Sequence, residues 1–314
     1  MNLKKGYLET PFDVVNLPSM GVFYPNKKSS LFIKYLTTRD EIVLTSPSII
    51  ENNQAIDIII ENSILDTDVN YHKLLACDKK AIMMFLRSTT YGDKLELNVN
   101  CPKCSSNSKS DFYLSSLEMK DDIKSPDKNL EYEFMMPKMK FKGENVVIKF
   151  KPLTVESENS LLQESKSTEK NGINNYSTLR LKYTITKVNE NDDKVFIENI
   201  IKIMPLGETA TLKKFIDQIE PGFEKNIKLN CSICNDVFLE KFNIGNEILT
   251  LSSEHRKNVM EETFLGYYYG KGLTREDMYK MSVSERRWTI QRISEEVEKK
   301  NKAEQDAVNK SKRK

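Results

Sequence analysis

Four of the five cysteines stand in two pairs with a spacing that suits metal binding. Cys101 and Cys104 form the first pair, and Cys231 and Cys234 form the second. A Cys-x-x-Cys turn presents two sulfurs to one ion, and two such turns complete the tetrahedral four-thiolate shell of a structural zinc site. The pairs are far apart in the sequence, so the segments that carry them must face each other. We therefore predict one structural Zn2+ bound by all four thiolates.

Two other interpretations of the pairs stay open. They could be reduced and metal-free, or they could perform redox or catalytic chemistry. A redox pair of the thioredoxin type lies at a helix N-terminus, which lowers the thiol pKa, whereas strand-like segments flank both pairs here. Four thiolates also leave no open coordination position for a substrate. The pattern therefore favours a structural site.

The other candidate ligands are distant from the pairs in the sequence. Cys77 lies in a predicted helix beside Ala76, and we predict a core position for it. The only two histidines, His72 and His255, are predicted at the surface or at helix ends. The chain has no Gly-rich phosphate loop, no HExxH and no GxSxG motif. We predict that the protein is not an enzyme and has no small-molecule substrate.

Strands are predicted to position both cysteine pairs. Alternating residues indicate one strand at Lys94 to Val99, which runs into the first pair, and another near Asp111 to Leu114, which leaves it. The second pair has the same setting, between strands at Asn226 to Asn230 and Val237 to Phe242. Each pair is thus predicted to form the turn of a hairpin, here called a knuckle.

The segments before the two knuckles follow one order. A strand leads to a Leu-Thr dipeptide and an acidic turn, with Thr37 in the first half and Thr154 in the second, and helices follow. Threonine before acidic residues is a typical helix N-cap. We predict an α+β fold of two duplicated halves, joined by the shared zinc site and followed by a helical C-terminal arm. The predicted divisions are residues 1–120, 121–250 and 251–314.

Apolar spacing predicts several helices within these halves, and polar composition predicts one loop. The predicted helical segments are residues 56–64, 74–86, 179–188, 195–204 and 210–219, and the loop spans residues 164–175.

The C-terminal arm has a different character. A helix is predicted at residues 254–269 and stops at Gly270. Ser282 to Glu285 form a capping box that begins a charged helix through about Lys300. Residues 301–314 are polar and basic, which predicts a disordered tail.

Trp288, the only tryptophan, lies about half a turn away from the apolar stripe of this charged helix. Trp and Arg are enriched at binding hot spots, and Arg286, Arg287 and Arg292 flank Trp288. These four residues are the candidate partner contacts. The alternative, which stays open, is that Trp288 packs under the aromatic run Tyr267 to Tyr269.

Composition limits the remaining functional classes. The 314 residues include 48 basic and 46 acidic side chains, for a net charge of +2, which does not indicate a polyanionic partner. Lys103 and Lys109 in the first knuckle could contact phosphate, but the second knuckle carries Asp236 and no basic residue. A zinc-knuckle nucleic-acid-binding protein is therefore the alternative function, and nucleic acid is not the predicted partner.

The lack of long hydrophobic segments predicts a protein that stays in the cytoplasm. No stretch approaches the roughly 20 apolar residues of a membrane helix, so no integral membrane segment is predicted. Residues 1–11 lack the apolar core of a signal peptide. In a reducing compartment, paired cysteines favour metal binding over disulfides.

Several motifs together resemble one family. The motif order is similar to that of the baseplate hub and hub-assembly proteins of T4-type contractile-tailed phages. The likeness covers most of residues 17–115 and continues more weakly through Leu153-Thr154 to the second knuckle and the 281–288 segment. Met20 and Lys79-Lys80 depart from the Arg or Gly usual in that family. The motifs are LPSMGVFYP from Leu17, LTTRDE from Leu36, the segment from Leu74 to Gly92 with Asp78 and Arg87, and the CPKC that follows.

The resemblance implies a role in virion assembly and no catalytic residues. The chain would be a structural component or an assembly factor of the central hub beneath the tail tube. It would be located in the tail baseplate of the virion, and in the host cytoplasm during assembly. Other hub proteins and the tape-measure protein are the expected partners, and we expect residues 254–300 to bind one of them.

Overall fold

The computed structural model of the chain describes residues 4, 10–46, 54–120, 124–141, 143–169, 176–245 and 248–312. The chain mixes helices with small antiparallel sheets and is 49% helical. The strands are β1 (Phe12–Asn16), β2 (Ser30–Lys34), β3 (Lys94–Asn100), β4 (Asn107–Tyr113), β5 (Tyr132–Phe141), β6 (Glu144–Phe150), β7 (Ile185–Val188), β8 (Asn226–Asn230) and β9 (Val237–Lys241). The helices are α1 (Thr38–Leu44), α3 (Gln54–Ser63), α4 (Ala76–Tyr91), α5 (Val155–Glu169), α6 (Tyr176–Thr184), α7 (Lys194–Ile203), α8 (Leu206–Ile219), α9 (Ser253–Tyr269), α10 (Arg275–Lys280) and α11 (Val283–Lys312).

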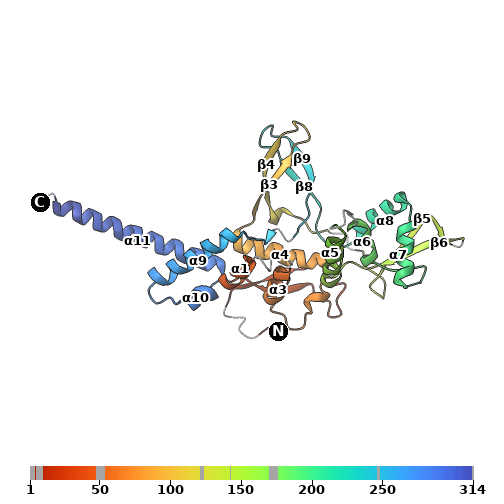
Figure 1. Cartoon of the computed structure of the whole chain (residues 1–314), viewed down its shortest axis with the longest axis horizontal. Coiled ribbons are helices and arrows are strands. Elements are labelled where there is room, and N and C mark those ends of the chain that lie inside the picture. The colour runs from red at the N-terminus through yellow and green to blue at the C-terminus, as the bar shows by residue number, and fades with distance from the viewer. Residues whose placement is uncertain are drawn as a thin grey trace.

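Figure 1 shows an elongated body from which two parts project. The hairpins β3–β4 and β8–β9 rise together as a stalk from the middle of the body. Helix α11 extends from one end, and the β5–β6 strands with α7 and α8 form the other end. The stalk therefore holds both predicted knuckles away from the body.

The first lobe, made of β1, β2, α1, α3 and α4, has its own apolar core. Strands β1 and β2 pair antiparallel, and the α3 residues Ile56, Ile59 and Ile60 are all buried against Ile82 and Leu86 of α4. The predicted helix from residue 56 is therefore confirmed, as is the apolar face of the one that follows. Because one face of each helix is apolar, packing against the small sheet buries both.

The Leu17–Pro25 segment forms tight turns that close over α4. The Ser19 backbone N–H and hydroxyl donate to the Asp78 carboxylate, at 2.9 and 2.6 Å. The Tyr24 hydroxyl also donates to Asp78, and it accepts the N–H of Leu75 at 2.9 Å. Gly21 has a φ of +74°, and a Cβ there would lie 2.6 Å from the backbone of Lys27, so only glycine fits this turn.

The second lobe consists of the three-stranded sheet β5–β6–β7 and helices α6, α7 and α8. Val146, Ile148 and Phe150 of β6 are fully buried, and Leu212 and Ile216 of α8 belong to the same core cluster. The helices predicted near residues 195–204 and 210–219 are both present as α7 and α8.

Two predictions in this lobe are wrong in part. The predicted loop at residues 164–175 is helical as far as Glu169, because α5 continues through it, and residues 170–175 lie outside the described part of the chain. The helix predicted at residues 179–188 ends at Thr184, and β7 begins at Ile185. Ile185 to Val188 is rich in β-branched residues, and these residues pair with the open edge of β6.

Two junctions of the same geometry connect segments that are distant in the sequence. At the first, an isolated antiparallel bridge pairs Thr37, the N-cap of α1, with Ser282 at the start of α11. At the second, the same kind of bridge pairs Leu75, the N-cap of α4, with Thr154 at the start of α5. Each bridge has two reciprocal backbone hydrogen bonds, which are Thr38 to Met281 (3.0 Å), Val283 to Leu36 (2.9 Å), Ala76 to Leu153 (2.8 Å) and Val155 to Leu74 (2.8 Å).

Opposite charges meet one helical turn beyond each bridge. At the first junction Glu41 of α1 and Arg286 of α11 form an ion pair at 2.6 Å. At the second, Glu158 of α5 lies 4.0 Å from Lys79 of α4, which also pairs with Asp57 at 2.8 Å. At both junctions the carboxylate lies one helical turn after the Thr of a Leu-Thr dipeptide. The predicted acidic turns therefore contact an Arg or Lys side chain of another helix.

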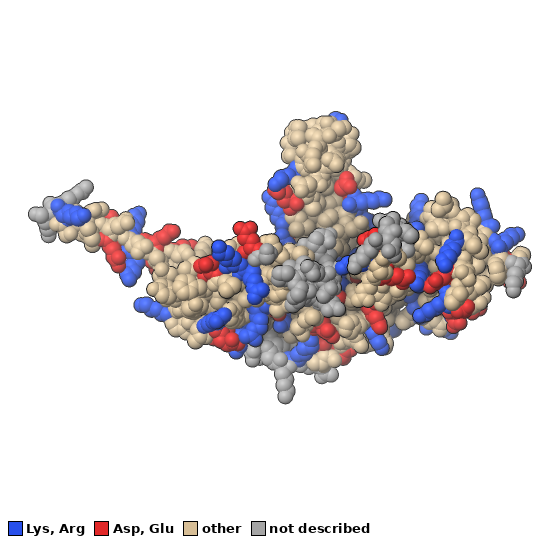
Figure 2. Space-filling view, viewed as in Figure 1, with Lys and Arg blue, Asp and Glu red and all other residues tan. Residues whose placement is uncertain are grey.

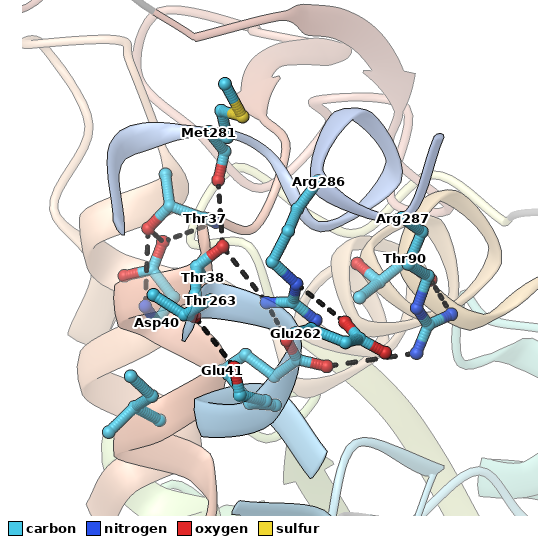
Figure 3. A network of polar contacts seen from close by, with 12 residues as sticks. Thr37, Thr38, Asp40, Glu41, Thr90, Glu262, Thr263, Met281, Arg286 and Arg287 are labelled. Carbon is cyan, nitrogen blue, oxygen red and sulfur yellow. Dashed lines mark hydrogen bonds and ion pairs between the residues drawn. The ribbon is translucent and has the colours of Figure 1, made fainter. Parts of the chain in front are cut away.

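Figure 3 shows the polar network at the first junction. The Arg286 guanidinium donates to Glu262 of α9 at 2.9 Å and to the Thr38 hydroxyl at 3.0 Å. Arg287 donates to the backbone carbonyl of Thr90 in α4 at 3.0 Å. Val283 and Leu249 belong to the core of the first lobe. The start of the C-terminal arm is therefore bound firmly to the first lobe.

Helix α11 is longer than predicted. It runs from Val283 through Lys312, so the disorder predicted for residues 301–314 is wrong for all but the last two, which lie outside the described residues. Glu, Lys, Ala and Gln have high helix propensity. Pairs one turn apart, such as Lys300 with Glu304, also support an exposed helix.

The duplication of the halves is not confirmed. Both halves place a helix after a Leu-Thr dipeptide and end in a knuckle hairpin. The first has a two-stranded sheet, however, whereas the second has three strands. The basic helix of one junction, α4, also lies within the first half, whereas that of the other, α11, lies in the C-terminal arm and outside both halves.

Candidate metal centre

Each cysteine pair forms the turn of a regular antiparallel hairpin, as predicted. Strand β3 pairs with β4 up to Asn100 and Asn107, and β8 pairs with β9 up to Asn230 and Val237. The bounds of β8 agree with the prediction, whereas β4 begins four residues before its predicted start at Asp111. The cysteines therefore sit at the ends of paired strands, which fix their direction.

The two turns have the same backbone conformation. The N–H of Ser105 donates to the carbonyl of Cys101 at 2.9 Å, and the N–H of Asn235 donates to that of Cys231 at 2.9 Å. Ser105 and Asn235 both adopt left-handed φ angles, of 54° and 56°. Matching turns point both sulfurs of each pair toward the other hairpin.

A small core and polar contacts bind the hairpins to each other. Val99 and Phe112 of the first hairpin form one buried cluster with Leu229 and Phe238 of the second. Nearer the turns, Lys103 and Asp236 form an ion pair between the knuckles at 2.9 Å. Figure 2 shows a mostly uncharged surface at the end of the stalk. The predicted facing arrangement of the knuckles is present.

The four sulfurs converge on one point. Cys101 Sγ lies 3.7 Å from Cys234 Sγ, and Cys104 Sγ lies 3.8 Å from Cys231 Sγ. All four sulfurs lie within 4.8 Å of one another, and none is in a disulfide. A zinc ion with metal–sulfur bonds of about 2.3 Å requires tetrahedral sulfur–sulfur edges of about 3.8 Å. The donor set and its size fit zinc.

Hydrogen bonds favour thiolate at some of these sulfurs. Backbone N–H groups of Cys234 and Ile233 lower the pKa of Cys231 to about 5, and the Ile233 N–H lies 3.4 Å from its sulfur. The Ser106 hydroxyl, 2.8 Å from Cys104 Sγ, lowers the pKa of that thiol. The Asp236 N–H lowers the pKa of Cys234, but burial and the neighbouring sulfurs raise it to about 12. A divalent cation would offset this mutual repulsion.

Two serines near the sulfurs were missed by the sequence prediction. Ser106 lies against Cys104, and the Ser108 hydroxyl donates to Cys231 Sγ at 3.7 Å. Ser108 and Ser110 are buried on the inner face of β4. Serines alternate with charged or polar residues after the first cysteine pair, which is the spacing of a strand with one buried face. Because serine is not hydrophobic, this alternation does not appear as a pattern of apolar residues. Such groups orient metal ligands and tune their basicity.

The other predicted candidates lie elsewhere. Cys77 is half-buried at the edge of the second-lobe core, and burial raises the pKa of its thiol. His72 lies in the short 3-10 turn Tyr71–Lys73. His255, in the first turn of α9, contacts Glu41 through Nε2 at 2.7 Å. The histidine positions agree with the prediction of surface or helix-end sites, whereas Cys77 packs against the core without being fully buried in it.

The two knuckle lysines are paired with carboxylates. Lys109 contacts Glu96 on the adjacent strand at 2.6 Å, and Lys103 contacts Asp236. Their charges are therefore balanced locally, which weakens the case for phosphate binding. Among the described helices, none combines the length and apolar content needed to cross a bilayer.

Comparison with known proteins identifies the family. A model of the family "T4 bacteriophage base plate protein" matches residues 22–244, more than half of the chain. The chain belongs to the T4 bacteriophage base plate protein family. The resemblance inferred from the motifs is thereby confirmed. No curated protein and no solved structure matches the chain.

Membership in this base plate family indicates a structural role in the phage tail, and such a role is not enzymatic. The family segment includes both knuckles and the second lobe. It also includes Tyr24 and Asp78, whose hydrogen bond joins the Leu17–Pro25 and Leu74–Gly92 segments in this chain. The match ends before α9, so the C-terminal helices lie outside the family segment.

Proposed function

We propose that the chain is a structural component or an assembly factor of the baseplate hub and acts through protein–protein contacts. The family match over residues 22–244 carries this proposal. The projecting stalk and the projecting helix α11 support it, because both offer surface far from the core. The virion tail, and the host cytoplasm during assembly, are its proposed locations.

We propose that one Zn2+ cross-links the two hairpins of the stalk through Cys101, Cys104, Cys231 and Cys234. Two-stranded hairpins are marginally stable alone, and a four-thiolate ion would supply a cross-link between them. The sulfur spacing and the lowered pKa of Cys231 support this role. The ion would act structurally, since all four positions of a tetrahedral shell would be filled by protein.

We also propose that the halves at residues 1–120 and 121–250 arose by duplication and that residues 251–314 form a separate functional arm. The matching knuckles and the two equivalent junctions support the duplication. The altered position of the basic helix would then be a later rearrangement.

Other hub proteins and the tape-measure protein are the proposed partners. Trp288 is 66% exposed and does not pack under the aromatic run Tyr267 to Tyr269, which is itself exposed. Arg287 and Arg292 are partly exposed. Arg286, however, is buried in the first junction, so we withdraw it from the proposed contact residues.

The proposal is tested by inactivating the gene in the phage and examining tails by electron microscopy and mass spectrometry. A subunit should be present in finished tails at a fixed copy number. An assembly factor should be absent from finished tails, yet tails should fail to assemble without it. Normal numbers of complete baseplates in its absence would refute both roles.

A further inference from the structure

A groove opens between α1 and α10. The two helices are neighbours in the fold (Figure 1), and the space between them measures about 530 Å3. Ligand pockets of proteins commonly measure about 300–1,000 Å3, so the groove has room for a few side chains of a partner. It is lined by Arg39, Ile42 and Val43 of α1 and by Arg275, Glu276 and Tyr279 of α10.

Half of this lining is apolar. Ile42, Val43 and Tyr279 are each partly exposed at the groove. The α1 residues follow i, i+3, i+4 spacing from Arg39, so one face of α1 forms this wall. Covering partly exposed apolar side chains in a concave surface releases water and favours binding.

Tyr279 holds the guanidinium of Arg275 in place beside the apolar lining. The guanidinium carbon lies 5.2 Å from the centroid of the Tyr279 ring. Nε and Nη2 of Arg275 both donate to the Tyr279 hydroxyl, at 3.1 and 2.8 Å, whereas Nη1 has no acceptor among the described residues. Because the five donors of a guanidinium form a planar fork, the end with Nη1 and the second hydrogen of Nη2 is free to bind a carboxylate at two points.

Arg275 is the residue of α1 and α10 whose charge no described residue offsets. Hydrogen bonds from Thr274, and the nearby Lys280, lower the pKa of Asp277, so Asp277 and Lys280 balance each other. The other charges of the two helices are in ion pairs, which are Arg39 with Glu276 (3.0 Å), Asp40 with Lys34 (4.0 Å) and Glu41 with Arg286 (2.6 Å).

The surroundings of Arg275 contain no competing acid. The hydrogen bond to Tyr279, followed by the nearby Tyr267, raises the pKa of Arg275, and both groups are neutral phenols. Within the described chain, no carboxylate forms an ion pair with Arg275. The groove lining itself has two guanidiniums and one carboxylate, a net charge of +1. The groove therefore complements a single negative charge next to apolar groups.

We propose that this groove binds a peptide segment of another tail protein in which one glutamate side chain stands between apolar residues. The glutamate carboxylate accepts hydrogen bonds from the free end of the Arg275 guanidinium. The apolar residues on either side of it cover Ile42 and Val43. Only the assignment of the segment to a tail protein rests on the proposed function.

The mixed lining favours such a peptide over a phosphate group. A phosphate monoester carries a charge of about −1.5 to −2 at neutral pH, and the Glu276 carboxylate repels the second charge. A phosphate group would also leave the apolar half of the lining uncovered. A single carboxylate with apolar neighbours satisfies both halves.

The test uses the full chain and short labelled peptides in fluorescence anisotropy. The probe is acetyl-Ser-Leu-Val-Glu-Val-Leu-Ser-amide, and the matched probe has Gln in place of Glu. The Glu probe should bind at least about fivefold more tightly than the Gln probe, which corresponds to ~1 kcal/mol. This preference should shrink as salt is added, because the ion pair is near the surface.

Three variants assign the two halves of the groove. Arg275→Gln should bind the two probes equally, since the preference depends on that charge. Arg256→Gln is the control, because Arg256 is exposed on α9 and does not line the groove; it loses the same charge and should keep the preference. Ile42→Gln should weaken both probes to the same degree and leave their ratio unchanged.

Five outcomes would overturn the proposal. Equal binding of the Glu and Gln probes, or no saturable binding at millimolar concentration, would remove the ligand. An unchanged preference in Arg275→Gln would remove the site. Equally tight binding of a Gln probe with a free C-terminal carboxylate would assign the groove to a chain end. Displacement of the Glu probe by inorganic phosphate but not by acetate would assign it to phosphate. None of these outcomes bears on whether tails require the chain.

Discussion

The guanidinium of Arg286 and the carboxylate of Glu41 lie 2.6 Å apart, and their side chains are 1% and 0% exposed. One residue belongs to the first helix and the other to the last, so this pair holds the ends of the fold together. Glu41 also accepts a hydrogen bond from Tyr91 at 3.0 Å and contacts His255. Each charge of this buried pair is stabilised only by its protein partners, because neither side chain is accessible to water. Removing one charge would leave the other buried without a counter-charge.

Replacing Arg286 with Met should destabilise the fold by about 3–5 kcal/mol, since it leaves the Glu41 charge buried and unpaired. Urea unfolding monitored by circular dichroism measures this. Arg292→Met is the control, because the carboxylates that Arg292 contacts among the described residues, Glu295 and Glu296, lie on the exposed surface of its own helix. That change should cost about 0.5 kcal/mol or less. Equal effects of the two changes would contradict the role of the junction.

Acid should weaken the first junction. Burial opposes ionisation of Glu41, but the Arg286 guanidinium and His255 hold the pKa of Glu41 below its usual 4.5. A lowered pKa in the folded state contributes stability above pH 4.5, and this contribution is lost as the pH falls through the folded pKa. Glu41→Gln should be less stable at neutral pH, and its unfolding free energy should fall less steeply below pH 4.5. Parallel pH profiles would count against this assignment.

The Tyr24 hydroxyl should matter far more than that of Tyr35. Tyr24 joins the Leu17–Pro25 turns to Asp78, where both partners are largely buried. Tyr24→Phe should cost about 1.5–3 kcal/mol because it removes a hydrogen bond to a buried charged group. Tyr35 donates to Asp13 at the surface, at 2.7 Å, so Tyr35→Phe should cost about 0.5 kcal/mol or less. Thermal unfolding of both variants decides the comparison.

The purified, reduced protein should contain one zinc ion per chain, measured by elemental analysis. Cys101→Ser or Cys234→Ser should abolish binding, because each removes one of the four thiolates. Cys77→Ser is the control and should keep the metal, since Cys77 lies outside the cluster. A chelator should lower the unfolding midpoint of the wild type and of the control only. Metal-free wild type, prepared with ample zinc, would contradict the site.

Deleting residues 301–314 should leave the unfolding midpoint and the zinc content unchanged. In the described part of this segment every side chain is exposed, so its removal takes no contact from the core. A deletion from residue 254 should instead destabilise the first lobe, because Val283 and Arg286 would be lost with it. Comparing the unfolding midpoints of the two truncations distinguishes the contribution of the projecting end of α11 from that of its buried first turn.

The knuckles could be predicted because local patterns determine them. Asn226 to Asn230 alternates between exposed and buried positions along one short strand, and the Cys-x-x-Cys turn then follows directly. The early part of β4 was missed because its inward side chains, Ser108 and Ser110, are polar. Their burial depends on the second hairpin, which no local pattern describes.

Long-range pairings explain the other errors. Ile185 to Val188 continues an apolar helical pattern, and only the free edge of β6 makes it a strand. The acidic turn at Glu41 was recognised as a helix start, but its basic partner on α11 could not be inferred from spacing. Arg286 was therefore assigned to a partner surface, although the fold uses it internally.

Helix α11 gives the molecule a lever arm. Its 30 residues rise about 1.5 Å each, for a length of about 45 Å, and only its first turns contact the body. A rotation of about 10° at the Arg286 fulcrum would move the far end by on the order of 8 Å over that length. A neighbouring protein that binds the far end of α11 therefore restricts the orientation of the body far more tightly than one that binds the base of the helix.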